Sequence, residues 1–250
     1  MAIYTIPVTY SIWFIDLFSP FSKLKVYIAQ SWVQPWLWAS RAKTTITHAI
    51  DYDKSKSYVV ISNHLSNLDN FLLFRYLKIK WVFMAKKEVY KLPVFRTAAR
   101  SFNFIKVDRK NVNDMKSIAD QAKRIFNNDW SIMIYPQGTR TDKNEKFNFK
   151  KGAFHIASQN NIPILPVVIS GTSEIWPKHS TYMNGGNVKI HTFEPIFVPN
   201  FQTNDIQNFI DDVQDPTEEC DTEPHGEADE ELVEDDVTDL PDTIQEEETY

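Results

Sequence analysis

The sequence predicts an α/β protein, a sheet flanked by helices, because short apolar runs alternate with amphipathic segments. The runs are rich in β-branched and aromatic residues, which is typical of buried strands. Strands are expected at 57–62, 81–85, 104–107, 131–135, 164–169 and 188–193. Helices are expected between them, at 67–77, 91–100, 111–127 and 151–159. This alternation implies helical layers on a sheet, in which ligands bind at the loops that follow the strands.

Charge divides the 250 residues into a basic body and an acidic tail. Residues 203–250 hold 20 of the 33 Asp and Glu and no Lys or Arg. The first 202 residues hold all 27 Lys and Arg and 13 acidic residues, a net charge of +14, which favours anionic partners. With 6 Gly and 1 Cys, the chain is neither collagen-like nor a disulfide scaffold. We expect a membrane-interface segment at 1–45, a folded domain at 46–202 and a disordered tail at 203–250.

The first 40 residues resemble the aromatic belt of a membrane interface, since they hold four of the seven Trp. Their two uncharged stretches, Met1–Ile15 and Val26–Ser40, fall short of the ~20 apolar residues that a spanning helix needs. We expect one or two amphipathic segments in the headgroup plane; an aromatic-rich pair of core helices is the alternative. No basic run precedes the apolar stretch, so no signal peptide is expected. The lone Cys220 fits a reducing compartment, which favours the cytoplasmic face of a membrane.

His64 and Asp69 form a candidate catalytic pair. On one continuous helix their five-residue spacing would leave them about 140° apart, so they would not meet. They meet if His64 lies in the turn that leaves the first strand and Asp69 lies in the first turn of the helix. Asp69 could then accept the Nδ1 proton of His64, which would leave the imidazole ready to take a proton from a hydroxyl. A structural histidine beside a capping aspartate is the alternative.

Three loops that follow strands carry cations that could hold a phosphate: Lys86 and Lys87, Arg109 and Lys110, and Arg140. Gly138 and Thr139 would let the backbone approach an anion closely. Each cation taken singly is also explained as a solvated surface charge. No nucleophilic side chain accompanies His64, which suggests that the substrate supplies the attacking hydroxyl. Neither a metal nor a cofactor is expected.

Five blocks in this order resemble the glycerolipid acyltransferase family, which contains the 1-acylglycerol-3-phosphate acyltransferases. NHLSNLD at 63–69 has the family's N-H-x4-D form, and YPQGTR at 135–140 is similar to F-P-E-G-T-R. The other three blocks are AKKEVYKLP at 85–93, FIKVDR at 104–109 and IPILPVVISG at 162–171. The resemblance covers roughly residues 57–176, about half of the chain.

The resemblance implies an acyltransferase domain at 46–202, built on the family's mixed sheet. It implies acyl transfer from acyl-CoA or acyl carrier protein to the sn-2 hydroxyl of 1-acyl-sn-glycerol-3-phosphate, giving phosphatidic acid in phospholipid biosynthesis. His64 would be the general base and Asp69 its orienting carboxylate. The acceptor phosphate and the rest of its pocket would be held by Lys86, Arg109, Gln137, Gly138, Thr139 and Arg140. Backbone N–H groups after His64 would stabilise the oxyanion.

Departures from the family pattern and two alternative functions remain open. Gln137 stands where the family usually has Glu. Asn103 stands where the family usually has Gly, and after Gly, Asn adopts the left-handed backbone conformation most readily. The acceptor could be another lysophospholipid or lyso-lipid. The chain could instead be a catalytically weak lipid-binding or scaffold relative whose acidic tail recruits a basic protein. A nucleic-acid partner is not expected, because no DNA- or RNA-binding module is recognisable.

Overall fold

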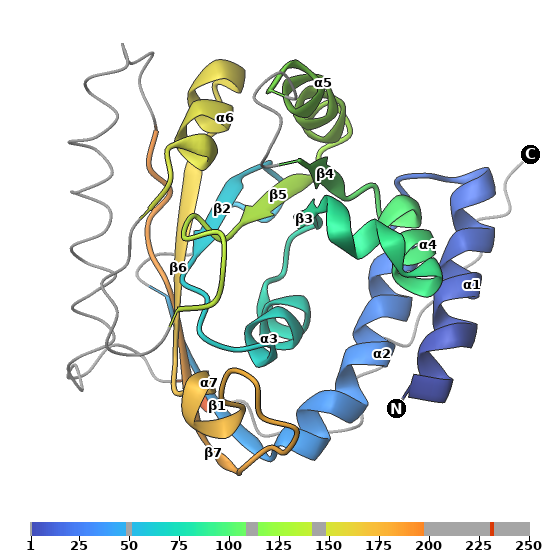
Figure 1. The fold of residues 1–250 in the computed structure, drawn as a ribbon. Coiled ribbons are helices and arrows are strands. Elements are labelled where there is room, and N and C mark those ends of the chain that lie inside the picture. The colour runs from blue at the N-terminus through green and yellow to red at the C-terminus, as the bar shows by residue number, and fades with distance from the viewer. Residues whose placement is uncertain (1, 49–51, 109–114, 142–148, 198–230, 233–250) are drawn as a thin grey trace, which may run out of the picture.

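Helices cover both faces of one mixed β-sheet (Figure 1). The computed structural model describes residues 2–48, 52–108, 115–141, 149–197 and 231–232. Within them the strand order is β4-β3-β5-β2-β6-β7-β1-β8. The strands are β1 (Ala42–His48), β2 (Val59–Ser62), β3 (Trp81–Lys86), β4 (Ile105–Val107), β5 (Ser131–Ile134), β6 (Ile164–Ser170), β7 (Gly186–Thr192) and β8 (Glu231–Leu232).

Two apolar cores lie on opposite faces of the sheet. Val59 and Ile61 of β2 pack with two of the helices, α5 (Met115–Phe126) and α6 (Gly152–Asn160). Val60, between them, packs on the other face with α3 (Leu68–Tyr76), as the alternation of side chains along a strand requires. The remaining helices are α1 (Ala2–Phe18), α2 (Leu24–Ser40), the 3₁₀ helix η1 (Lys87–Lys91), α4 (Pro93–Ser101) and α7 (Thr172–Ile175).

Strands β2 and β5 are parallel neighbours within the sheet. Strands β4, β3, β5, β2 and β6 are parallel, and β7 runs antiparallel to β6. The chain leaves β2 for β3 through α3 on one face of the sheet, and leaves β5 for β6 through α6 on the other. The carboxyl ends of β2 and β5 therefore lie side by side at one edge of the sheet, where the loops of an open α/β sheet usually bind ligands.

The predicted α/β class with a mixed sheet is confirmed, and each of the six expected strands is present with shifted ends. Strand β1 was not predicted, because its sequence AKTTITH lacks an apolar run; it pairs in parallel with β7. It begins at Ala42, ahead of the predicted boundary at 45/46. The start of the expected helix 111–127 lies outside the described residues, as does the predicted tail apart from the two residues of β8.

The N-terminal aromatic segment forms an antiparallel pair of helices, α1 and α2, beside α4 (Figure 1). Helix α2 also packs against α3, which carries Asp69. Asn103 follows α4 with φ of 56°, so the left-handed geometry expected where the family has Gly is confirmed. Its side-chain amide donates to the carbonyl of Pro20, between α1 and α2, at 2.8 Å. The N-terminal pair is thereby connected to the sheet through both α3 and α4.

Candidate active site

The predicted contact between His64 and Asp69 is confirmed. His64 lies two residues beyond β2, and Asp69 is the second residue of α3. His64 Nδ1 and Asp69 Oδ2 are 2.8 Å apart. A carboxylate only accepts, so Nδ1 carries the proton and Nε2 is left as the basic nitrogen of the neutral ring.

The Asp69 carboxylate is almost fully buried and accepts four hydrogen bonds. Besides His64 Nδ1, Oδ2 accepts the backbone N–H groups of Leu65 at 2.9 Å and Ser66 at 2.8 Å. Oδ1 accepts the hydroxyl of Thr172 at 2.6 Å. Four donors offset the cost of burying this carboxylate and fix its orientation. The N–H groups of Leu65 and Ser66 are therefore occupied, so neither serves as one of the oxyanion donors expected at the start of the helix after His64.

Tyr135 covers one face of the His64 ring. The two rings are stacked with centroids 3.9 Å apart and planes inclined by 10°. The Tyr135 hydroxyl donates to Asn70 Oδ1 at 2.9 Å, which ties the end of β5 to α3. Burial raises the pKa of the Tyr135 phenol well above its ordinary value, and the Asp69 carboxylate adds to the rise. The phenol therefore stays protonated at neutral pH and keeps this hydrogen bond.

Two amides hold the turn that carries His64. The Asn63 side chain donates to the carbonyl of Ile169 at 2.8 Å and accepts its N–H at 2.9 Å, which joins the turn to β6. Gln137, also buried, accepts the backbone N–H of His64 on Oε1 at 2.9 Å. Its Nε2 donates to Thr141 Oγ1 at 3.3 Å. A predicted acceptor-pocket residue, Gln137 is thus engaged in supporting His64.

The loop after β5 lies against the His64 turn. The N–H of Thr141 donates to the carbonyl of His64 at 3.0 Å, which brings the adjacent Arg140 next to the turn. Gly138 has φ of 78° and donates its N–H to the carbonyl of Tyr135 at 2.9 Å, a tight turn that favours glycine. Thr139 is exposed and Arg140 half-buried. These three predicted residues therefore lie in the loop that contacts the His64 turn.

Two more of the predicted cations, Lys86 and Lys87, lie at the carboxyl end of β3, at the same edge of the sheet. Lys86 ends β3, pairs with Val107 in register and is exposed. Lys87 forms an ion pair with Asp108 at 2.6 Å, and this hydrogen bond raises the pKa of Lys87. Arg109, predicted to hold the phosphate, lies outside the described residues. Within the described ranges no three His, Cys, Asp or Glu side chains gather as metal ligands.

Two parts of the site were missed by the sequence analysis. Thr172 follows β6, and because β6 is parallel to β2, both strands end at the same edge. His64 and Arg140 were selected as polar residues in loops that follow strands, and the same criterion would also have selected Thr172. The stacking of Tyr135 on His64 carried no such signal, because an aromatic residue at a strand end is usually a core residue.

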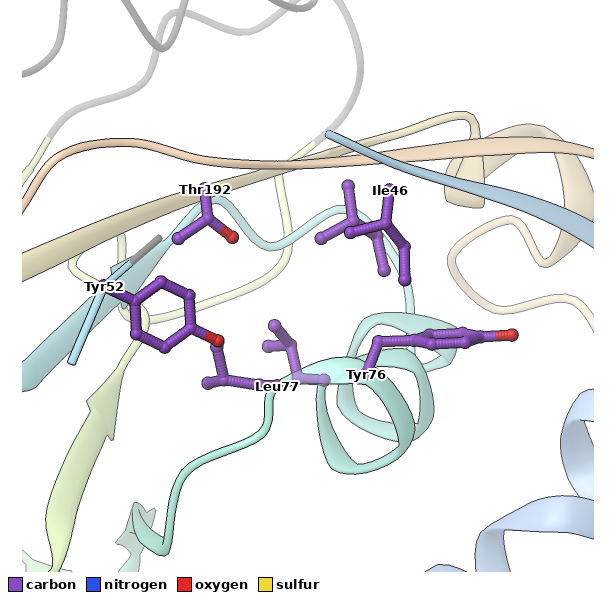
Figure 2. Close-up of a pocket in the computed structure, with 7 residues that line it drawn as sticks. Ile46, Tyr52, Tyr76, Leu77 and Thr192 are labelled. Carbon is purple, nitrogen blue, oxygen red and sulfur yellow. The ribbon is translucent and has the colours of Figure 1, made fainter. Parts of the chain in front are cut away.

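A small pocket lies away from this constellation, between the end of α3 and strands β1 and β7 (Figure 2). The residues that line it are Ile46, Tyr52, Leu73, Tyr76, Leu77, Ile190 and Thr192. None of them is a predicted site residue, so this pocket is not assigned to the candidate active site.

By its fold and site, the chain is an α/β protein with a His–Asp pair and nearby cations at the carboxyl edge of a mixed sheet. Residues 43–170 match a family model described as Acyltransferase, and the chain belongs to this family. The resemblance seen in the five sequence blocks is thereby confirmed at the level of the family.

Several relatives carry the name 1-acyl-sn-glycerol-3-phosphate acyltransferase. The protein of Cocos nucifera is 31% identical over 154 residues, covering 61% of this chain and 50% of that protein. The alpha form of Bos taurus is 28% identical over 173 residues, covering 69% of this chain and 60% of that protein. The matches thus span half to three fifths of these relatives.

A solved structure has the same fold. The 1-acyl-sn-glycerophosphate (LPA) acyltransferase PlsC of Thermotoga maritima superposes with a TM-score of 0.68. The superposition covers 90% of this chain and 93% of that one, at 21% sequence identity.

Proposed function

We propose that the chain transfers an acyl group from an acyl thioester, acyl-CoA or acyl-ACP, to the sn-2 hydroxyl of 1-acyl-sn-glycerol-3-phosphate. The contact between His64 Nδ1 and Asp69 Oδ2 carries this proposal, because it leaves Nε2 free to act as a base. The similarity to proteins named 1-acyl-sn-glycerol-3-phosphate acyltransferase supports this acceptor.

In this mechanism Nε2 of His64 takes the proton of the sn-2 hydroxyl. The alkoxide oxygen attacks the thioester carbonyl, a C–O bond forms, the C–S bond breaks and the thiolate leaves. The imidazolium, stabilised by Asp69, then returns its proton to the thiolate. General-base catalysis contributes roughly 10²–10⁴ in rate, and positioning of the two substrates must contribute much of the remainder.

The acceptor phosphate is proposed to bind at the carboxyl edge beside His64. Arg140 borders the turn, Lys86 ends a neighbouring strand, and Arg109 follows the next. Gly138 and Thr139 would complete the pocket, while Gln137 acts through the His64 backbone. An Arg fork pairs with two phosphate oxygens at once, which suits this headgroup.

We further propose that α1 and α2 bind the chain to a lipid surface, at the cytoplasmic face of a membrane. Large apolar side chains of α1 are exposed, including Phe14 at 60%, Leu17 at 59% and Phe18 at 78%. Trp38 of α2 is 80% exposed. In the part of the chain that the structure describes, no helix has both the length and the apolarity to span a bilayer. An apolar surface on a body of net charge +14 suits an anionic lipid interface.

The test is phosphatidic acid formation by purified protein from 1-acyl-sn-glycerol-3-phosphate, with acyl-CoA and acyl-ACP as separate donors. We expect turnover with wild type, and a loss of at least about 10³-fold in His64→Ala with an unchanged circular dichroism spectrum. A folded His64→Ala protein with near wild-type turnover would refute the proposed base. A panel of other lysophospholipids and lyso-lipids separates the alternative acceptors, and absence of thioester turnover with all of them would favour the scaffold alternative.

A further inference from the structure

Thr172 contacts Asp69 on the side of the carboxylate that does not face His64. It lies outside the predicted site residues, after β6, and its side chain is fully buried. Its hydroxyl lies 2.6 Å from Asp69 Oδ1, the carboxylate oxygen that does not face His64. A carboxylate only accepts, so Thr172 is the donor.

We propose that Thr172 is a positioning residue for the reaction: it fixes the Asp69 carboxylate so that Oδ2 is presented to His64 Nδ1. The inference rests on the proposed function. Oδ2 already accepts two backbone N–H groups besides Nδ1, whereas Oδ1 has Thr172 as its hydrogen-bond donor among the described residues. The hydrogen bond to Oδ1 holds the second oxygen and opposes rotation of the carboxylate about the Cβ–Cγ bond.

The backbone around Thr172 is built to hold this hydroxyl in place. Gly171 has φ of 84°, and a Cβ on it would lie 2.1 Å from the carbonyl oxygen of Asn187, so the sharp turn into α7 requires glycine. At the other end of α7 the Ser66 hydroxyl donates to the Trp176 carbonyl at 2.7 Å. Helix α7 therefore contacts the catalytic turn at both ends, through Thr172 and through Trp176.

Loss of the hydroxyl should affect turnover more than substrate binding. An unpaired Oδ1 in a buried site would draw the carboxylate toward another donor and rotate Oδ2 away from Nδ1. The imidazole would then lose its orientation and the support of its charged form in the transition state. The predicted phosphate-binding residues lie on other loops, so acceptor binding should be preserved.

The decisive variant is Thr172→Val, which keeps the shape of the side chain and removes the hydroxyl. We expect kcat to fall about 10- to 100-fold, the size of effect that a small misplacement of catalytic groups produces, with KM changed less than about twofold. Thr192→Val is the matched control, since Thr192 is an equally buried threonine on β7. Its kcat should stay close to that of wild type.

Thr172→Ser and Thr172→Ala form a second pair, which is informative even if the valine variant does not fold. Both remove the methyl group, and they differ only in the hydroxyl. Serine should retain kcat within about threefold of wild type, while alanine should lose about as much as valine. Equal kcat values for serine and alanine would overturn the inference, as would a change confined to KM.

A double-mutant cycle separates positioning from a general loss of stability. If Thr172 acts through Asp69, Thr172→Val should add little to the loss already caused by Asp69→Asn. Additive losses would contradict the inference. Failure of the proposed function is a different result, because wild type itself would then show no thioester turnover.

Discussion

Gln137 is one of the residues at which the chain departs from the family pattern, and in the structure its side chain contacts the His64 turn. Its Oε1 accepts the N–H of His64, and a Glu carboxylate in the same place would also provide an acceptor. The charge that Gln lacks is therefore not needed for this contact. The departure gives no support of its own to a catalytically weak relative.

Two substitutions at Gln137 test this explanation. Gln137→Glu should keep kcat within about threefold of wild type, because the acceptor is retained. Gln137→Leu should leave a buried N–H unpaired, which costs about 1–3 kcal/mol, and should lower kcat at least about tenfold. Measurements of kcat and of thermal unfolding on wild type and both variants test these two expectations. A gain of more than about tenfold in Gln137→Glu would instead identify the missing charge as a defect.

The pH dependence of stability is a second test at a single side chain, Tyr135. Its pKa is raised in the folded chain by burial and by Asp69, so the folded state holds this proton more tightly than the unfolded state. The stabilisation is fully present below the unfolded pKa of about 10 and is lost as pH rises beyond it. Wild type should therefore lose more stability than Tyr135→Phe between about pH 9 and about pH 11.

Tyr135→Phe is the appropriate comparison with wild type, because the substitution removes only the hydroxyl and keeps the aromatic ring that stacks on His64. Urea unfolding of both proteins at several pH values gives the difference in unfolding free energy. A difference that stays constant over this range would contradict the buried-phenol explanation, since a group with equal pKa in both states contributes no slope.

A buried ammonium joins three helices. Lys25 of α2 is fully buried and donates to the Asp16 carboxylate at 2.6 Å and to the carbonyls of Pro20 and Ser101. Burial lowers the pKa of Lys25, and Asp16 opposes this shift by favouring the charged form. The side chain thus connects the end of α1, the start of α2 and the end of α4.

Lys25→Met should detach these helix ends, because it removes the donor and leaves its acceptors behind. We expect the unfolding free energy to fall by roughly 3 kcal/mol, the lower part of the range for breaking a buried ion pair. Lys23→Met is the control: Lys23 is exposed two residues earlier, and its loss should cost less than about 0.5 kcal/mol. Equal stabilities of the two variants in chemical denaturation would show that the connection contributes nothing.

Helix α2 is also joined to the site through stacked aromatic rings. Trp36 stacks on Phe71 of α3 with centroids 5.3 Å apart and on Trp176 with centroids 6.1 Å apart. Phe71 follows Asp69 by two residues, and the Trp176 carbonyl accepts the Ser66 hydroxyl. The proposed membrane-binding helices and the catalytic turn therefore share a rigid aromatic contact.

Across the chain, the exposed apolar residues of α1 and the basic charge of the body should act together on an anionic surface. Phe14→Ser combined with Phe18→Ser should weaken binding to vesicles containing anionic phospholipid about tenfold or more, because buried aromatic area drives such partitioning. Sedimentation with vesicles measures this binding. Tyr182→Ser, at another exposed aromatic residue outside the helical pair, should leave it unchanged. Equal binding of all three proteins would exclude this surface as the lipid contact.

The sequence by itself determined most of the strands and helices and the contact at the centre of the candidate site. Apolar runs predict the strands, because strands buried in a parallel sheet are apolar. The cations that come directly after these runs are then predicted to lie in the loops at the strand ends. The contact between His64 and Asp69 also followed from local spacing, since a turn and the first turn of the next helix bring them together. Strand β1 did not follow, because its polar residues acquire a partner only when β7 lies beside them.

Only the tertiary structure decided which groups contact the candidate catalytic pair, His64 and Asp69. Thr172 is separated from Asp69 by 103 residues and Gln137 from His64 by 73, so no local pattern relates them. They meet because β2, β5 and β6 are parallel neighbours whose carboxyl ends share one edge. Strand order depends on long-range packing of the two cores, a property that periodicity within short segments does not contain.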